Sequence, residues 1–247
     1  MAAVQRDYNL ESRQFGDRKY NYDFDSIVRG YMMRAFDPWL PKGRALELGC
    51  YDGESTAWLL SKYTDLTVIE AASGLVDIAR QRFPGRARFI CSTFEECDLA
   101  ETFDSVFLIN TLEHLDDPVL VLSKIRDWLA PGGRLFLLVP NAHAPSRQIA
   151  GKMGLITHDS AVTEAEFKNG HRNTFSFDTL ERCARDAHLK AIHRGGLIFK
   201  ALANYQFDLA LKHGVINAAY IEGCYDLGML YPDMCASIYL ICEKDRA

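Results

Sequence analysis

The sequence predicts an α/β protein built around a parallel sheet. Short apolar runs alternate with helical stretches of about ten residues between positions 44 and 140, and this alternation is typical of βαβ units. The runs are apolar at successive positions, as expected for strands that are buried on both faces of a sheet. A glycine-containing loop follows the first run, at the edge where open parallel sheets bind their ligands.

The elements follow in a regular order. A helix is expected over residues 27–36, where the apolar spacing is amphipathic and Pro38 and Pro41 end it. The alternation then predicts strands at 44–48, 66–70, 87–91, 103–109 and 134–139. Helices are expected at 54–63, 74–83 and 118–129, with a turn at 131–133. Pro118 suits the first turn of its helix because the missing N–H has no partner there.

The pattern changes after Pro140. Residues 141–173 have weak periodicity, so we expect this segment to be a functional loop or partly helical. Beyond it, the sequence predicts a helix at 177–187, a strand at 190–199, two helices within 202–230 and a last strand at 236–242. Ser176 and Asp178 are candidate caps for the first of these helices, and Asp117 is a candidate cap for the helix that starts at Pro118.

Composition and charge exclude several classes of protein. The chain has 247 residues, of which 48% are apolar and 25% charged, with a formal net charge of −5. Such a chain is not expected to be disordered or to bind nucleic acid. Its longest apolar stretches fall far short of the ~20 residues that span a bilayer. The seven cysteines form no CxxC pair and the N-terminus has no apolar signal core, so we expect a cytoplasmic protein with free thiols.

The sharpest local feature is the loop ELGCYDG, residues 47–53, between the first strand and the first helix. Gly49 lets the backbone turn, and Gly53 lets a ligand lie close to the chain. Glu70 ends the second strand, where its two oxygens can accept from both hydroxyls of a ribose. A strand-end glutamate alone is often a plain surface residue. The GxGxxG dinucleotide fingerprint is not matched because Tyr51 stands at its second glycine, so loop and acid together predict a nucleoside ligand without a pyrophosphate.

Four segments carry a resemblance to a known family. ALELGCYDGEST resembles motif I of the class I S-adenosylmethionine-dependent methyltransferases, and TVIEAA is similar to their ribose-binding strand end. FDSVFLINTLEHLDDP and LAPGGRLFLLVPN resemble the fourth and fifth strands, so the resemblance covers residues 44–140. GHRNTFSFDTLERCARDAHL resembles the small-molecule branch that includes ubiquinone O-methyltransferases, and the chain is also similar to an uncharacterised bacterial group carrying SRQIAxKMG and AVTEAEF.

This resemblance implies the fold, the cofactor and the acceptor class. The fold would be Rossmann-like, with a mostly parallel seven-stranded sheet, helices on both faces and a helical substrate lid. The cofactor would be S-adenosyl-L-methionine, with S-adenosyl-L-homocysteine as product, and the acceptor a small molecule. Glu47 would act near the methionine amino group and Glu70 would hold the ribose hydroxyls. The other implied cofactor residues are Gly49, Cys50, Tyr51 and Gly53 in the loop, Ala71, Thr93 and Phe94 beside the adenine, and Asn110 and Thr111 at the methionine end.

We expect residues 1–247 to form a single methyltransferase domain, since the later strands continue the same sheet. Its expected parts are an N-terminal helical cap (1–43), a cofactor-binding core (44–140), a lid or substrate insert (141–175), and C-terminal helices with the final strands (176–247). Five aromatic residues of the first part would either close over the cofactor or pack the helix on the sheet: Tyr20, Tyr22, Phe24, Tyr31 and Phe36.

The resemblance makes His114 a candidate general base, because it follows Glu113 just past the fourth strand, near the expected methyl group. The alternative is that His114 packs or caps the loop. In the ubiquinone branch, a glutamate three residues before this Glu-His pair has been linked to a divalent metal. Asn110 occupies that position here, so we expect no metal.

The 141–173 insert is locally basic in an acidic chain. His143, Arg147, His171 and Arg172 lie in it, over the expected substrate mouth, which favours an anionic acceptor such as a carboxylate or phosphate. A solvated lid face is the alternative. We expect transfer to a hydroxyl or carboxylate oxygen. N-methylation of a small metabolite, a non-catalytic S-adenosylmethionine-binding protein, a nucleotide-dependent oxidoreductase and a macromolecular target are the alternatives.

Overall fold

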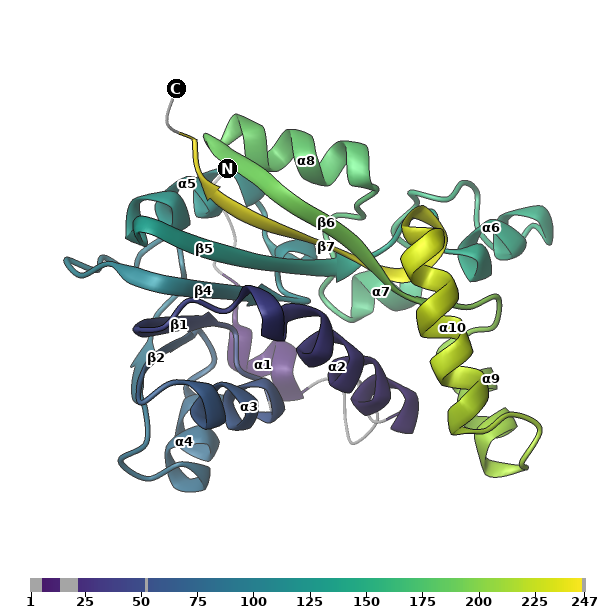
Figure 1. Ribbon diagram of the computed structural model, residues 1–247, viewed down its shortest axis with the longest axis horizontal. Coiled ribbons are helices and arrows are strands. Elements are labelled where there is room, and N and C mark those ends of the chain that lie inside the picture. The colour runs from purple at the N-terminus through teal and green to yellow at the C-terminus, as the bar shows by residue number, and fades with distance from the viewer. Residues whose placement is uncertain (1–5, 14–21, 52, 246–247) are drawn as a thin grey trace.

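The computed structural model describes residues 6–13, 22–51 and 53–245. Its strands form one seven-stranded sheet in the order β3-β2-β1-β4-β5-β7-β6 (Figure 1). The pairs from β3 to β5 are parallel, and β7 runs antiparallel to both β5 and β6. The strands are β1 Arg44–Leu48, β2 Asp65–Glu70, β3 Arg88–Cys91, β4 Phe103–Ile109, β5 Leu129–Pro140, β6 Leu189–Phe199 and β7 Cys235–Lys244. The predicted mostly parallel seven-stranded sheet is therefore confirmed.

Helices connect these strands. The α-helices are α1 Tyr8–Arg13, α2 Asp23–Phe36, α3 Glu54–Lys62, α4 Ser73–Arg82, α5 Pro118–Trp128, α6 Pro145–Lys152, α7 Glu164–Lys168, α8 Phe177–Asp186, α9 Asn204–Lys212 and α10 Ala218–Leu230. Short 3-10 turns lie at η2 Asp37–Trp39, η3 Leu112–His114 and η4 Pro232–Met234. Within the described ranges, no helix combines the length and the apolar character needed to cross a membrane.

Both faces of the sheet are covered, which explains why its strands are apolar at successive positions. Along β5, Leu137 joins a cluster with side chains of α5 and α8, whereas Phe136 and Leu138 join a cluster with α2, α3, α4, α9 and α10. The rings of Phe107 and Phe136 stack at 4.8 Å in the second cluster. Since both faces are occupied by helices (Figure 1), the edge formed by the strand ends is left to bind ligands.

Three local predictions were tested by cap and turn geometry. Asp117 caps α5, accepting a hydrogen bond from the Leu120 amide at 3.0 Å, and Ser176, not Asp178, caps α8 in a reciprocal box with Thr179. The predicted turn at 131–133 is wrong as a strand boundary. Strand β5 begins at Leu129, which already pairs with Phe103, so these residues form an irregularity within the strand.

The N-terminal aromatic residues pack against the body of the protein. Phe24 lies against Phe207 of α9, and Tyr31 stacks on Tyr225 of α10 at 4.7 Å. Phe36 is fully buried against the sheet. Tyr22 is exposed, and Tyr20 lies outside the described residues. Phe24, Tyr31 and Phe36 thus follow the packing alternative, and the exposed Tyr22 does not.

Candidate active site

A cavity of about 220 Å³ opens at the carboxyl ends of β1, β2 and β4. These ends meet because β1 lies between β2 and β4. The connections from β1 to β2 and from β3 to β4 leave this point toward opposite edges of the sheet, and such a point is where parallel sheets form a binding crevice. Most of the predicted cofactor residues line this cavity: Gly49, Cys50, Tyr51, Glu70, Ala71, Thr93, Phe94, Asn110 and Thr111. The predicted base, His114, lines it as well.

The loop after β1 passes very close to the loop after β4. Gly49 has a φ of 81°, and a Cβ added there would lie 2.9 Å from Oγ1 of Thr111. The Thr111 hydroxyl in turn bonds the carbonyl oxygens of Leu48 at 3.3 Å and Ile109 at 3.0 Å. Tyr51 and Asn110 also have positive φ values, 44° and 48°, a conformation that costs energy in residues with a side chain. The two loops are therefore held in a strained, well-defined arrangement around the cavity.

Glu70 places a buried carboxylate in the cavity wall. Its side chain accepts the backbone N–H of Cys50 on one oxygen, at 3.2 Å, and that of Ala72 on the other, at 2.9 Å. Burial raises the pKa of Glu70, and the hydrogen bonds from backbone amides oppose this effect. Each carboxylate oxygen has two acceptor positions, so each can also accept a hydroxyl from a ligand.

Glu47 and Gly53 do not line the cavity. The Glu47 carboxylate is 2% exposed and accepts a hydrogen bond from the Thr56 hydroxyl of α3 at 2.6 Å. Gly53 is the residue before α3, and its amide donates to the Cys50 carbonyl at 2.8 Å. These two residues support the two ends of the loop, and Asp52, which precedes Gly53, lies outside the described residues.

The segment around α1 supplies a wall that sequence reasoning missed, with Arg6, Tyr8 and Glu11 lining the cavity. The Arg6 guanidinium bonds both Glu11 oxygens, at 3.0 and 2.8 Å, and the His114 carbonyl at 2.8 Å. Hydrogen bonding to Glu11 raises the pKa of Arg6. The sequence held one weak signal, an aspartate directly before the helix. In the structure the Asp7 side chain accepts from the Leu10 amide at 2.9 Å, as an N-cap does. Further lining residues missed are Arg29, Ser55, Ala72, Leu75, Glu95, Ile109 and Leu115.

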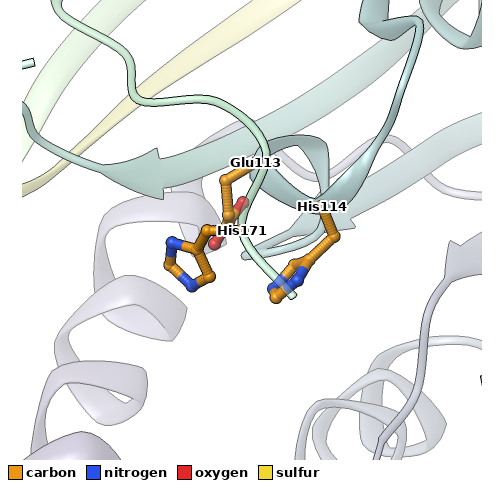
Figure 2. Close-up of side chains that lie close together, drawn as sticks. All are labelled: Glu113, His114 and His171. Atoms are coloured by element: carbon orange, nitrogen blue, oxygen red, sulfur yellow. The ribbon is translucent and has the colours of Figure 1, made fainter. Parts of the chain in front are cut away.

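Glu113, His114 and His171 converge beside the cavity (Figure 2). The rings of His114 and His171 are 4.7 Å apart, nearly perpendicular to each other. The Glu113 side chain is 2% exposed, and this burial raises its pKa to about 8. His171 reaches this place because the amides of Arg172 and Asn173 donate to the Glu113 carbonyl, at 2.7 and 3.1 Å. The insert is thus joined to η3 by backbone hydrogen bonds.

None of the four predicted substrate residues lines the cavity, and they separate into two pairs. His171 and Arg172 contact residues that do line it: the His171 ring lies against that of His114, and Arg172 is 3.9 Å from Glu11 and 3.7 Å from Asp116. Arg147 instead bonds the Asp159 carbonyl at 2.8 Å and pairs with Glu166. Its guanidinium therefore holds α6 and α7 together within the insert. His143 is exposed just before α6, and neither His143 nor Arg147 lines the cavity.

Comparison with known proteins identifies the family. The profile of a methyltransferase domain family, Methyltransf_23, matches residues 20–194, more than half of the chain. The chain belongs to this family. The fold agrees with solved methyltransferase structures: NodS N-methyltransferase from Bradyrhizobium japonicum WM9, crystallised with S-adenosyl-L-homocysteine, has a TM-score of 0.61 at 15% identity and covers 97% of this chain and 98% of its own. An S-adenosylmethionine-dependent methyltransferase from Thermotoga maritima has a TM-score of 0.64 at 19% identity, covering 95% and 99%.

Curated relatives of this methyltransferase domain are more similar in sequence over shorter lengths. It is 29% identical over 127 residues to trans-aconitate 2-methyltransferase from Methylobacterium nodulans, covering 47% of each chain. It is 28% identical over 134 residues to malonyl-[acyl-carrier protein] O-methyltransferase from Anoxybacillus flavithermus, covering 52% of each. The chain thus spans about half the length of these two relatives. The predicted family and its Rossmann-like class I fold are confirmed.

Proposed function

We propose that this protein is an S-adenosylmethionine-dependent methyltransferase that methylates an oxygen atom of a small molecule. The observation that carries the proposal is the Glu70 carboxylate, buried in the cavity wall beside the tight turn at Gly49. A buried acid with acceptor positions facing a cavity suits a ribose diol, and a turn without a side chain lets a ligand approach the backbone. The residues present therefore fit a nucleoside cofactor.

Each part of the cofactor would have its own residues. Glu70 would hold the ribose hydroxyls, with Ala71, Thr93 and Phe94 beside the adenine. Gly49, Cys50 and Tyr51, together with Asn110 and Thr111, would surround the methionine end. Glu47 and Gly53 would act through the loop that they support. When bound, S-adenosylmethionine supplies a methyl group on a sulfonium, which is a good leaving group.

His114 would take up the proton of a hydroxyl acceptor, because its imidazole lines the same cavity as Glu70. Arg6 fixes the His114 backbone through its carbonyl, which supports a defined ring position. Orientation of the acceptor next to the methyl group would provide most of the acceleration. A carboxylate acceptor would need positioning but no base.

An anionic acceptor is the second part of the proposal. Its support is the pair His171 and Arg172, which contact the cavity-lining residues His114 and Glu11, together with the names of the two curated relatives, which specify trans-aconitate and a malonyl group. His143 and Arg147 would contribute through the shape of the insert. We further propose that the four parts of the chain, residues 1–43, 44–140, 141–175 and 176–247, form one domain. We also propose that the protein acts in the cytoplasm, which the seven free cysteines support.

Titration with S-adenosylhomocysteine tests the cofactor claim. We expect the full chain to bind this ligand, and Glu70→Gln to weaken binding by roughly tenfold to 100-fold, since a hydrogen bond to a charged group contributes about 1.5–3 kcal/mol. Glu96→Gln is the matched control, because Glu96 is an exposed acid outside the cavity lining. Absence of binding by the unaltered protein would refute the cofactor.

A transfer assay with methyl-labelled cofactor and pooled carboxylic acids and phenols then tests turnover. Label in a base-labile ester indicates a carboxylate oxygen, and label in a base-stable ether indicates a hydroxyl. Label on an amine would favour the N-methyltransferase alternative. Cofactor binding without transfer to any pool would favour a non-catalytic binding protein.

A further inference from the structure

We propose that Glu113, His114 and His171 form a binding site for one divalent transition-metal ion at the wall of the cavity. The inference comes from the convergence of one buried carboxylate and two imidazoles on a common point (Figure 2). It replaces the expectation of no metal that the sequence suggested. It does not depend on the proposed methyl transfer, because it concerns only what these three side chains hold.

The spacing of the ligand atoms fits one ion. One ligand atom from each residue lies within 4.8 Å of the other two. Around a tetrahedral Zn²⁺ with bonds of about 2.0–2.1 Å, neighbouring ligand atoms are about 3.4 Å apart. Small side-chain rotations therefore bring the three groups into contact with a shared ion. Among the residues that the structure describes, no other group of three or more such side chains meets this spacing.

The Glu113 carboxylate supplies the second, independent observation. Its side chain is 2% exposed, and its Oε2 atom has no hydrogen-bond partner within the described part of the chain. A buried carboxylate oxygen without a donor is costly, whereas a bound cation would compensate both the charge of the group and the missing bond.

The third ligand comes from the insert and not from the neighbouring sequence. His171 is 57 residues after His114, yet the adjacent amides of Arg172 and Asn173 bond the Glu113 carbonyl. Gly170 permits the close approach, because its φ is 86° and a Cβ there would lie 3.2 Å from Nδ1 of His114. Asn110, on the loop that precedes η3, belongs to the cofactor side of the cavity and takes no part.

The ligand types select the class of ion. Two imidazoles and one carboxylate suit Zn²⁺ and related transition metals, whereas Mg²⁺ and Ca²⁺ prefer all-oxygen sites. The nearest cations are already paired with acids: Arg6 with Glu11 at 2.8 Å and Arg172 with Asp116 at 3.7 Å. Three protein ligands would leave at least one position for a further ligand, and one of the three, His114, lines the cavity.

Metal binding and general-base catalysis would compete for one imidazole. A His114 ring that is bound to an ion cannot also accept the proton of the acceptor. Saturation with the metal would therefore remove the base, and a chelator would restore it. The two roles can be separated in one protein by comparing the loaded and the chelated forms.

Zinc titration of the chelator-treated full chain is the test. We expect one equivalent of Zn²⁺ to bind, and His171→Ala and Glu113→Gln each to weaken binding by at least roughly tenfold, as even supporting residues of metal sites do. Co²⁺ in place of Zn²⁺ should give visible absorption bands that both variants lose. His158→Ala is the matched control, because His158 is an exposed histidine of the same insert, and it should bind Zn²⁺ as the unaltered chain does.

Circular dichroism establishes that each variant is folded. If Glu113→Gln does not fold, the zinc affinity of His171→Ala decides whether the site exists. His171 is only partly buried, so we expect this variant to fold. Failure of the unaltered protein to bind Zn²⁺, or equal affinity in both variants and the unaltered protein, would overturn the site. S-adenosylhomocysteine binding is measured on the same samples. Its absence would count against the proposed function and leave the metal result intact.

Discussion

Two walls of the cavity are built by different means. The cofactor wall, residues 49–51, 70–72 and 109–111, consists of strand ends whose backbone is fixed by the sheet and by hydrogen bonds such as Gly49 N to Ile69 O at 2.9 Å. The lid wall consists of residues 6–11, with residues 170–173 beside them. Arg6 joins it to the core through the His114 carbonyl and Asp116, and residues 172–173 are joined to Glu113 by backbone hydrogen bonds as well as to Asp116 by the Arg172 ion pair. Backbone geometry can hold a ligand that is always the same. Side-chain pairs can be replaced by substitution without rebuilding the sheet, so the specificity for the acceptor can change while the cofactor wall stays as it is.

The largest expected effect breaks the cofactor wall. Gly49→Ala introduces a Cβ at a φ of 81°, 2.9 Å from the Thr111 hydroxyl. We expect a loss of about 1–3 kcal/mol in the free energy of unfolding and a roughly tenfold to 100-fold weaker binding of S-adenosylhomocysteine. Urea unfolding and calorimetric titration measure the two quantities.

Gly223→Ala is the control for this change. Gly223 lies in α10 with open space at the Cβ position, so the alanine should stabilise the helix by up to about 1 kcal/mol without altering ligand binding. Equal effects of the two substitutions would show that the turn at Gly49 is not special.

A second prediction compares two buried charges. Glu70 accepts hydrogen bonds from backbone amides, including those of Cys50 and Ala72. Lys200, directly after β6, donates to the Leu202 carbonyl at 2.8 Å, has the Asp25 charge nearby and lies against the rings of Phe24 and Phe207. Burial lowers the pKa of Lys200 to about 8. We expect Lys200→Met to stabilise the protein at pH 7 by an amount on the order of 1–3 kcal/mol, reduced by the lost contacts.

The pH dependence gives the sign of this effect. Between pH 8 and about 10.5 the unfolded chain keeps the Lys200 proton that the folded chain has released, so stability rises with pH in this window. Below pH 8 the full penalty is present. The advantage of the Lys200→Met variant should therefore shrink between pH 8 and 10, as measured by urea unfolding at each pH. A constant difference would contradict the assignment.

The smallest expected effect concerns the insert. Arg147→Met removes the guanidinium that joins α6 to α7 through Glu166 and the Asp159 carbonyl. We expect about 1–2 kcal/mol of destabilisation with unchanged affinity for S-adenosylhomocysteine, because Arg147 does not line the cavity. In the same assays Lys168→Met, which removes an exposed pair with Glu164, should change neither quantity. Weaker cofactor binding in Arg147→Met would show that the two walls are coupled.

The same contrast decides what the sequence could predict. The positions of the parallel strands, Gly49 and Glu70 were predictable, because apolar runs define such strands and strand ends define the ligand edge. The start of β5 at Leu129 was not, because Pro131, Gly132 and Gly133 interrupt its apolar pattern. The convergence of Glu113 with His171 was not, since nothing in the local pattern says where the insert returns. Arg147 was interpreted from its charge alone, and its partners lie inside its own segment. Helix α1 is short and polar, so it has little apolar periodicity to reveal it.

The position of β7 has a consequence for the order in which this protein can assemble. Residues 235–244 form an inner strand that pairs with β5 on one side and with β6 on the other. On the ribosome, the five parallel strands are complete about 95 residues before β7 begins, and until then β5 presents an open, apolar edge. The sheet closes only when this late segment is inserted between its neighbours, and the interval before that is when the nascent chain is most exposed to aggregation.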